Sequence, residues 1–289
     1  MQGTVDGFSY GLVTPVVAYL MACLGGALGL RCTTRAMLVD GRWRIGWLAL
    51  GSAAIGSGIW TMHFVAMMGF TVLRTPVEYD PLTTFASLAV AIVMVGIGIF
   101  MVASKGATGA ALFTGGTITG LGIASMHYLG MAGMRLNGTL EYNTVTVAAS
   151  VVIAVVAAIA ALWAAGQVRG FLWSVGASLV MGFAVSGMHY TGMAALSVHL
   201  HSAASTAPAG GSSSAALLAP LMIGPLVFLL LAGVVVMFDP FMIMGRFHGG
   251  PVERRPGIPA QASAHTCRRQ ESYAGREHHE RRSRTPQNR

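Results

Sequence analysis

Seven long apolar runs constrain the fold of this chain more than any other feature of its sequence. A helix needs about 20 apolar residues to cross the roughly 30 Å hydrocarbon core of a bilayer, and each run is long enough. Charged residues make up only 10% of the chain and lie in short clusters between the runs, whereas a soluble domain carries about 25%. The sequence therefore predicts an all-α, polytopic membrane protein. Its expected spans are residues 10–30, 45–70, 82–103, 110–134, 145–165, 171–196 and 217–244.

Arginine and lysine are divided unevenly between the two sides of the predicted membrane. Of the 18 basic residues, 16 fall on the side that holds the loop after the first span and the C-terminal tail. Only Arg74 and Arg135 fall on the other side. Because loops that face the cytoplasm carry the excess of Lys and Arg, we predict that the N-terminus lies outside and the C-terminus inside a plasma membrane.

The chain divides into a membrane domain, residues 1–245, and a tail, residues 246–289. The domain is predicted to contain three helical hairpins followed by one helix. The tail is rich in Pro, Arg, His and Glu and shows no apolar periodicity, which is typical of a disordered cytoplasmic segment. The net charge of +8 reflects this tail and the membrane orientation, so it does not indicate nucleic acid binding. The outer loop 197–216 is rich in Ser, Ala and Gly and is expected to be flexible.

A six-residue motif, Met-His-aromatic-x-small-Met, lies near the C-terminal end of the second, fourth and sixth spans. Its copies are residues 62–67, 126–131 and 188–193, and their histidines are 64 and 62 residues apart (127 − 63 and 189 − 127). A glycine lies seven residues before each histidine, and Ile or Val lies four before it. This internal repeat places all three motifs at the outer ends of their spans. Equal depth and orientation allow the histidines to converge on one site but do not require it.

Imidazole and thioether together suggest a metal site. Residues four apart share a face of a helix, so each copy can present His and Met side by side. These ligands suit copper, particularly Cu(I). Haem is another candidate because His and Met are also axial haem ligands, but it is less favoured because a haem pocket would more often use two facing histidines and here there are three. The candidate ligands are Met62, His63, Met67, Met126, His127, Met131, Met188, His189 and Met193.

Two further positions of the motif repeat. The small residue would let neighbouring helices approach closely, and it is Ala66, Gly130 or Gly192. The aromatic residue is interpreted as part of the belt at the membrane interface, and it is Phe64, Tyr128 or Tyr190. The alternative for the whole motif is simple packing, in which case replacing His127 with Ala would change stability but no metal content.

The third copy, Met188-His189-Tyr190-Thr191, spells the signature of the MHYT family of bacterial integral-membrane sensor domains. The chain resembles this family over roughly residues 8–245; the second copy keeps three of the four signature positions and the first keeps two. The resemblance implies that the nine Met and His residues hold copper and that the domain senses a diatomic gas such as O₂, CO or NO. Family members often carry cyclic-di-GMP-turnover or histidine-kinase modules, and the tail resembles neither, so we expect a separate, unknown cytoplasmic signalling partner.

The sequence therefore suggests a membrane sensor that binds copper through three outer-facing motifs and reports a gas or a redox state. Two alternatives use the same ligands: a copper carrier and a haem-binding electron-transfer protein. We find no Walker motif, no GxSxG and no HExxH, so we do not expect an enzyme. The partners that we expect are the lipid bilayer, a diatomic gas and the cytoplasmic signalling protein.

Overall fold

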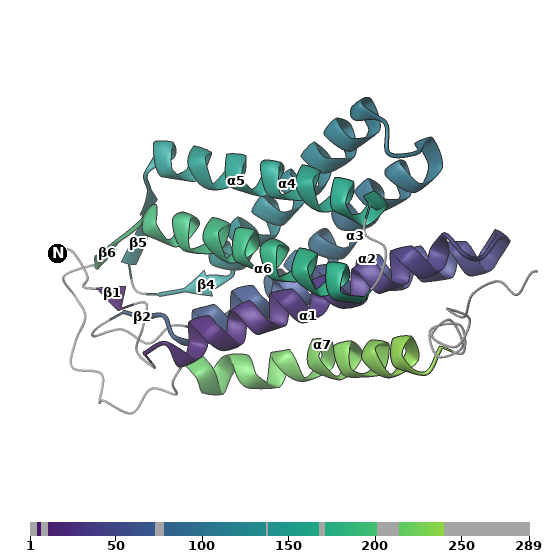
Figure 1. Ribbon diagram of the computed structural model, residues 1–289. Coiled ribbons are helices and arrows are strands. Elements are labelled where there is room, and N and C mark those ends of the chain that lie inside the picture. The colour runs from purple at the N-terminus through teal and green to yellow at the C-terminus, as the bar shows by residue number, and fades with distance from the viewer. Residues whose placement is uncertain are drawn as a thin grey trace, which may run out of the picture. The chain divides into compact units, whose positions relative to one another are not determined.

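The computed structural model describes residues 5–6, 11–72, 78–136, 138–167, 171–200 and 214–239. Within these residues, seven helices are long and apolar enough to cross a membrane, which confirms the predicted multi-pass protein of the plasma membrane (Figure 1). The helices are α1 (Val13–Ala36), α2 (Gly41–Met68), α3 (Pro81–Lys105), α4 (Gly109–Ala132), α5 (Thr144–Gln167), α6 (Phe171–Ala194) and α7 (Ser214–Met237). The predicted tail, residues 246–289, lies outside the described residues.

The helices differ from the predicted spans mainly at the end of the bundle where α1 meets α2. Both helices continue past their apolar runs and include four arginines. By contrast, α7 ends at Met237, seven residues before the predicted end. Asp239 precedes a proline in the sequence, and a residue before proline disfavours the helical conformation. Its carboxylate forms a buried ion pair with Arg35 of α1, which holds the end of α7 against the bundle.

Helices α1 to α6 form a closed ring in chain order, with α6 returning to α1. Close approach of the first hairpin depends on two facing glycines: a Cβ on Gly25 would lie 2.7 Å from the Cα of Gly58. The helix α7 lies outside the ring and packs against α1 and α2 through Leu229, Ala232 and Val236. The three hairpins therefore surround one common axis.

Short strands join the loops at one end of the bundle in three antiparallel pairs (Figure 1). The pairs are β1 (Val5–Asp6) with β2 (Thr71–Val72), β3 (Glu78–Tyr79) with β4 (Met134–Arg135), and β5 (Gly138–Tyr142) with β6 (Leu196–Leu200). The expectation of a flexible loop over residues 197–216 is therefore wrong for its first part, since residues 197–200 belong to β6 and pair with β5. Residues 201–213 lie outside the described part. Each strand finds its partner about 55 to 70 residues away in the chain, so no local pattern indicated the pairing.

Candidate metal centre

The three motif histidines occupy equivalent places on α2, α4 and α6. His63, His127 and His189 each lie five residues before the last residue of their helix. These helices come from different hairpins and run in the same direction along the bundle (Figure 1). The histidines therefore lie at the same level, next to the end that carries the strand pairs.

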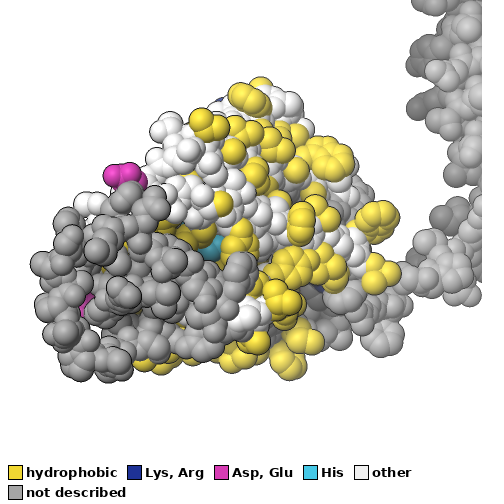
Figure 2. Space-filling model, turned by 90° about the vertical axis from the view of Figure 1, so that its left-hand side faces the viewer, with side chains coloured by type: hydrophobic (Ala, Val, Ile, Leu, Met, Phe, Trp, Pro, Cys, Tyr) yellow, Lys and Arg dark blue, Asp and Glu magenta, His cyan; other side chains and the backbone are white. Residues whose placement is uncertain are grey.

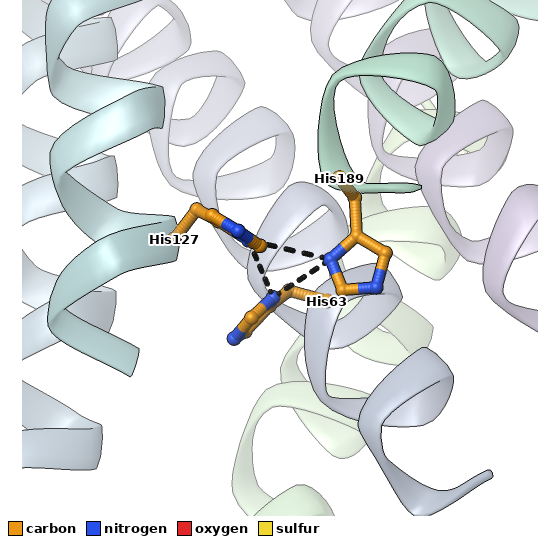
Figure 3. Close-up of side chains that lie close together, drawn as sticks. All are labelled: His63, His127 and His189. Atoms are coloured by element: carbon orange, nitrogen blue, oxygen red, sulfur yellow. Dashed lines mark hydrogen bonds between the residues drawn. The ribbon is translucent and has the colours of Figure 1, made fainter. Parts of the chain in front are cut away.

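The side chains of these histidines meet on the axis of the ring (Figure 3). The Nδ1 atom of His63 lies 3.0 Å from that of His189 and 3.2 Å from that of His127, and the third Nδ1–Nδ1 distance is 3.3 Å. No histidine of the three is more than 2% exposed. The three motifs thus contribute to a single buried cluster.

The three imidazole rings are arranged around the point where their Nδ1 atoms meet, each ring at a steep angle to the other two. Each pair of rings is close to perpendicular, with interplanar angles of 76°, 79° and 89° and centroids 4.9–5.1 Å apart. The lone pair of an unprotonated Nδ1 lies in the plane of its ring, so all three lone pairs can point to one centre. This arrangement is one that three ligands of a single ion would adopt.

Three neutral imidazoles cannot all form hydrogen bonds with one another through these three Nδ1 atoms. A neutral Nδ1 is either an N–H donor or a lone-pair acceptor, so at least two of three mutually adjacent Nδ1 atoms are of the same kind. At least one of the three contacts is then repulsive, whereas a central cation would accept all three lone pairs. Three nitrogens bound tetrahedrally at about 2.0–2.1 Å, the zinc–nitrogen distance, would be about 3.3–3.4 Å apart, close to the distances here. The histidines therefore fit one metal ion and leave a coordination position open.

The small residue of the motif makes room for a histidine of the neighbouring repeat. A Cβ on Gly130 would lie 2.7 Å from Nε2 of His63, and a Cβ on Gly192 would lie 2.5 Å from Nε2 of His127. The two Nε2 atoms are buried and have no hydrogen-bond partner among the described residues. The two glycines therefore leave space for an imidazole ring and fix where two of the rings lie; the nearest contacts at these positions are with histidine side chains, and not the helix–helix approach that the sequence predicted.

The methionines of the motif are buried to different extents. Five of them are no more than 1% exposed, namely Met62, Met67, Met126, Met131 and Met188, and Met193 is half-buried. The cluster of candidate metal ligands found among the described His, Cys, Asp and Glu residues consists of the three histidines. Coordination by a thioether stays a prediction.

The interpretation of the motif aromatics as interface residues is wrong for the first copy, whereas Tyr128 of the second copy is half-buried. Phe64 is fully buried in the core, with its ring 4.6 Å from that of His63. Tyr128 forms a hydrogen bond of 2.6 Å between its hydroxyl and Oγ of Ser150. Both aromatics lie beside the histidine that precedes them and act as packing around the cluster, because the motif faces the bundle axis and not the lipid.

Two buried serines, which the sequence analysis missed, hold aromatic side chains next to the site. Ser87 of α3 accepts a hydrogen bond of 3.0 Å from Nε1 of Trp60, and Ser150 of α5 bonds Tyr128. The serines are 63 residues apart (150 − 87), the spacing of the repeat. A lone serine recurring at this spacing inside apolar spans was the signal that could have identified them.

The strand end of the bundle covers the cluster. Tyr79 of β3 places its ring 6.2 Å from that of Phe64, and its hydroxyl is buried without a hydrogen-bond partner among the described residues. Burial raises the pKa of Tyr79, so this side chain is neutral. Seen from this end, the described surface is mostly apolar or uncharged, with acidic side chains near its margin and histidine visible at one spot (Figure 2). The site therefore lies in surroundings of low polarity.

Comparison with known proteins supports the reading of the motif. The MHYT family model, described as a bacterial signalling protein N-terminal repeat, matches residues 56–115 and 120–178. These residues include the first two motifs, and the third, residues 188–193, lies beyond the second match. No solved structure matches the chain.

Three signalling proteins are similar to the chain. The bifunctional diguanylate cyclase/cyclic di-GMP phosphodiesterase MucR of Pseudomonas aeruginosa is 39% identical over 192 residues, which cover 65% of this chain and 28% of MucR. The cyclic di-GMP phosphodiesterase NbdA of the same organism is 36% identical over 68% of this chain and 26% of its own length. The signalling protein YkoW of Bacillus subtilis is 30% identical over 66% and 24%.

The chain thus spans about a quarter of the length of the curated relatives that it matches. The matched family repeats, the similarity to signalling proteins and the three motifs on membrane-spanning helices agree with one another. The chain belongs to the MHYT family of bacterial membrane signalling proteins.

Proposed function

We propose that this protein is a membrane sensor that holds one copper ion at the three-histidine cluster and reports a diatomic gas or a redox state. The observation that carries the proposal is the mutual approach of the three Nδ1 atoms to 3.0–3.3 Å inside the bundle. A signalling role is supported by the relatives, one of which is named as a signalling protein and another for cyclic di-GMP turnover. The metal, the sensed ligand and the route of the signal are parts of the proposal.

The ligand set favours copper over other ions. Imidazole suits Cu, Zn, Fe and Ni, while the thioethers of methionine favour Cu(I). Five of the six motif methionines are buried and neighbour the histidines in sequence, and no carboxylate joins the cluster among the described residues. When bound, copper would supply an open coordination position and a change between two oxidation states. His63, His127 and His189 would hold it, and Gly130 and Gly192 would position two of the rings.

The geometry argues against haem. Haem uses two axial ligands on opposite faces of a flat macrocycle, so the macrocycle must lie between them. Here each Nδ1 is within 3.3 Å of the other two, and the rings leave no room for a macrocycle between them. The arrangement supports a small ion and weakens the electron-transfer alternative.

A signal could arise because each ligand comes from a different hairpin. A change in coordination would alter how α2, α4 and α6 pack around the axis, and the closed ring would carry that change to the other end of the bundle. The sequence-based orientation puts that end in the cytoplasm. Two relatives are named for cyclic di-GMP synthesis or hydrolysis, so we propose that a cytoplasmic partner acting on cyclic di-GMP receives the signal.

The test is the metal content of purified protein in detergent. We expect about one copper per chain in the wild type and a loss of copper in the triple variant His63→Ala, His127→Ala, His189→Ala. The matched control replaces His199, a histidine that belongs to none of the three motifs, with Ala and should keep its copper. Copper that is substoichiometric in the wild type, or that is unchanged in the triple variant, would refute the copper site and leave packing as the role of the motif.

A further inference from the structure

An apolar cavity of about 40 Å³ lies inside the ring of helices, lined by residues that neighbour the motif histidines in sequence but by none of the histidines themselves. Ile59, Ile123 and Val185 form part of its wall, and each lies four residues, about one helical turn, before a motif histidine. Met188, which precedes His189 directly, also lines it. Ile59, Ile123 and Val185 occupy the hydrophobic position that repeats in the sequence, and they form this part of the wall.

The cavity is suited to an apolar molecule of a few atoms. Its two polar lining residues, Thr33 and Thr119, use their hydroxyls in hydrogen bonds to backbone carbonyls. A buried water needs two to four polar partners, which this wall does not offer. A volume of about 40 Å³ exceeds the roughly 10–15 Å³ that one water-sized probe needs but is too small for a lipid chain or an aromatic ring.

A groove between α5 and α6 reaches this cavity from the side of the bundle. The groove has a volume of about 810 Å³ and shares Ala157, Ala161 and Met181 with the wall of the cavity. Trp163 and Trp173, which are 55% and 73% exposed, lie along it. Because α5 and α6 are membrane-spanning helices, a groove on their exposed side opens to the lipid.

The side chain of Met181 separates the groove from the cavity. It lines both hollows, and its Cε atom extends from α6 to Gly26 of α1, where a Cβ would collide with it. Methionine is unbranched and has three rotatable side-chain bonds. Rotation of this one side chain can therefore open a passage without any movement of a helix.

We propose that small, neutral, apolar molecules dissolved in the bilayer reach the histidine cluster through the α5–α6 groove, past Met181 and through the cavity. Such molecules concentrate in lipid, whereas ions pay a large desolvation cost in an apolar passage. The passage therefore admits a ligand of the metal but not the metal itself. This inference rests on the proposed function, in which an ion at the cluster binds the molecule that arrives.

A second opening provides the competing route. A hollow of about 280 Å³ at the end of the bundle opposite the histidines shares Thr33, Ile99, Leu162 and Ala165 with the cavity. Its wall includes Arg44, whose guanidinium donates a hydrogen bond of 2.6 Å to the carbonyl of Ala103. A charged wall disfavours an apolar molecule relative to the groove, and the two routes are separated by residues one turn apart on α5.

The experiment compares Ala161→Phe with Ala165→Phe in the full chain, reconstituted in lipid nanodiscs and loaded with Cu(I). Carbon monoxide is the probe, and its rebinding rate is measured after flash photolysis. Ala161 lies between groove and cavity, and Ala165 between the opposite hollow and cavity. We expect Ala161→Phe to slow rebinding about tenfold, the effect of roughly 1.4 kcal/mol of added barrier, and Ala165→Phe to leave it within about twofold. The milder Met181→Ala should accelerate rebinding.

The outcomes separate this inference from the proposed function. Equal rates in the wild type and Ala161→Phe, or slowing in Ala165→Phe alone, would overturn the lateral route. If the wild type holds no copper, the proposed function fails, and the route is then judged in metal-free crystals pressurised with xenon. Xenon in the cavity of the wild type would support an apolar site there, and an empty cavity under pressure would overturn it.

Discussion

Replacing Gly130 with Ala should weaken metal binding at the histidine cluster. The added Cβ would lie 2.7 Å from Nε2 and 3.1 Å from Cδ2 of His63. Ordinary contacts of a Cβ begin at 3.4 Å, so the ring must withdraw by about 0.7 Å (3.4 − 2.7). The imidazole is rigid, and its Nδ1 moves with Nε2, out of the triangle that it forms with the other two histidines.

The magnitude follows from the cost of overpacking, about 1–3 kcal/mol. In the metal-free protein the ring can shift within its buried surroundings, whereas a bound ion would hold Nδ1 in place, so the larger part of the cost falls on the loaded state. At about 1.4 kcal/mol for each factor of ten, copper affinity should fall by roughly 5- to 150-fold. Gly192→Ala should behave alike, since its Cβ would lie 2.5 Å from Nε2 of His127.

The assay is a competition titration of purified protein with a Cu(I) chelator, with thermal unfolding of the metal-free protein alongside. The matched control is Gly187→Ala, two residues before His189 on α6, because no atom lies within 4 Å of a Cβ there. That variant should bind copper like the wild type and should gain up to about 1 kcal/mol from the higher helix propensity of Ala. Wild-type affinity in Gly130→Ala, or an equal loss in the control, would refute the argument that this contact positions His63.

Other predictions concern the parts that support the site. Ser150→Ala removes the partner of the Tyr128 hydroxyl and should destabilise the protein by about 1 kcal/mol, whereas Ser104→Ala, at an exposed serine, should have almost no effect on thermal unfolding. Asp239→Leu removes the carboxylate that forms a buried ion pair with Arg35 and should cost about 3–5 kcal/mol, while the double variant with Arg35→Met should regain most of it; a similar loss in both would show that the pair is not the cause. Hydrogen bonds from the first turn of α3 hold the pKa of Asp80 below its usual 3.8, so its contribution is complete above pH 3.8 and is lost as the pH falls through the lowered pKa. The melting temperature of Asp80→Ala should therefore converge on that of the wild type in strong acid, and a gap that persists there would contradict this assignment.

The extent of each helix was largely predictable because it depends on neighbours in the chain. A run of about 20 apolar residues specifies a span by itself, and every predicted span corresponds to one helix. The errors lie in segments whose structure also depends on contacts with residues that are distant in the sequence. Helices α1 and α2 continue beyond the apolar runs, α7 stops early at Met237, and residues 197–200 form a strand. That strand depends on a partner that is remote in sequence.

The sequence by itself determined that His63, His127 and His189 lie at one depth, since each closes an apolar run of the same repeat. Only the tertiary structure decided that their Nδ1 atoms meet. Depth depends on the position of a residue along its own helix, but convergence depends on how the helices are rotated and packed about a shared axis. Contacts between distant segments fix that rotation: α6 closes the ring against α1, and Gly130 and Gly192 each accept the histidine of another repeat. Spacing along the chain carries no information about such rotation. The sequence alone therefore does not distinguish one shared cluster from three separate sites.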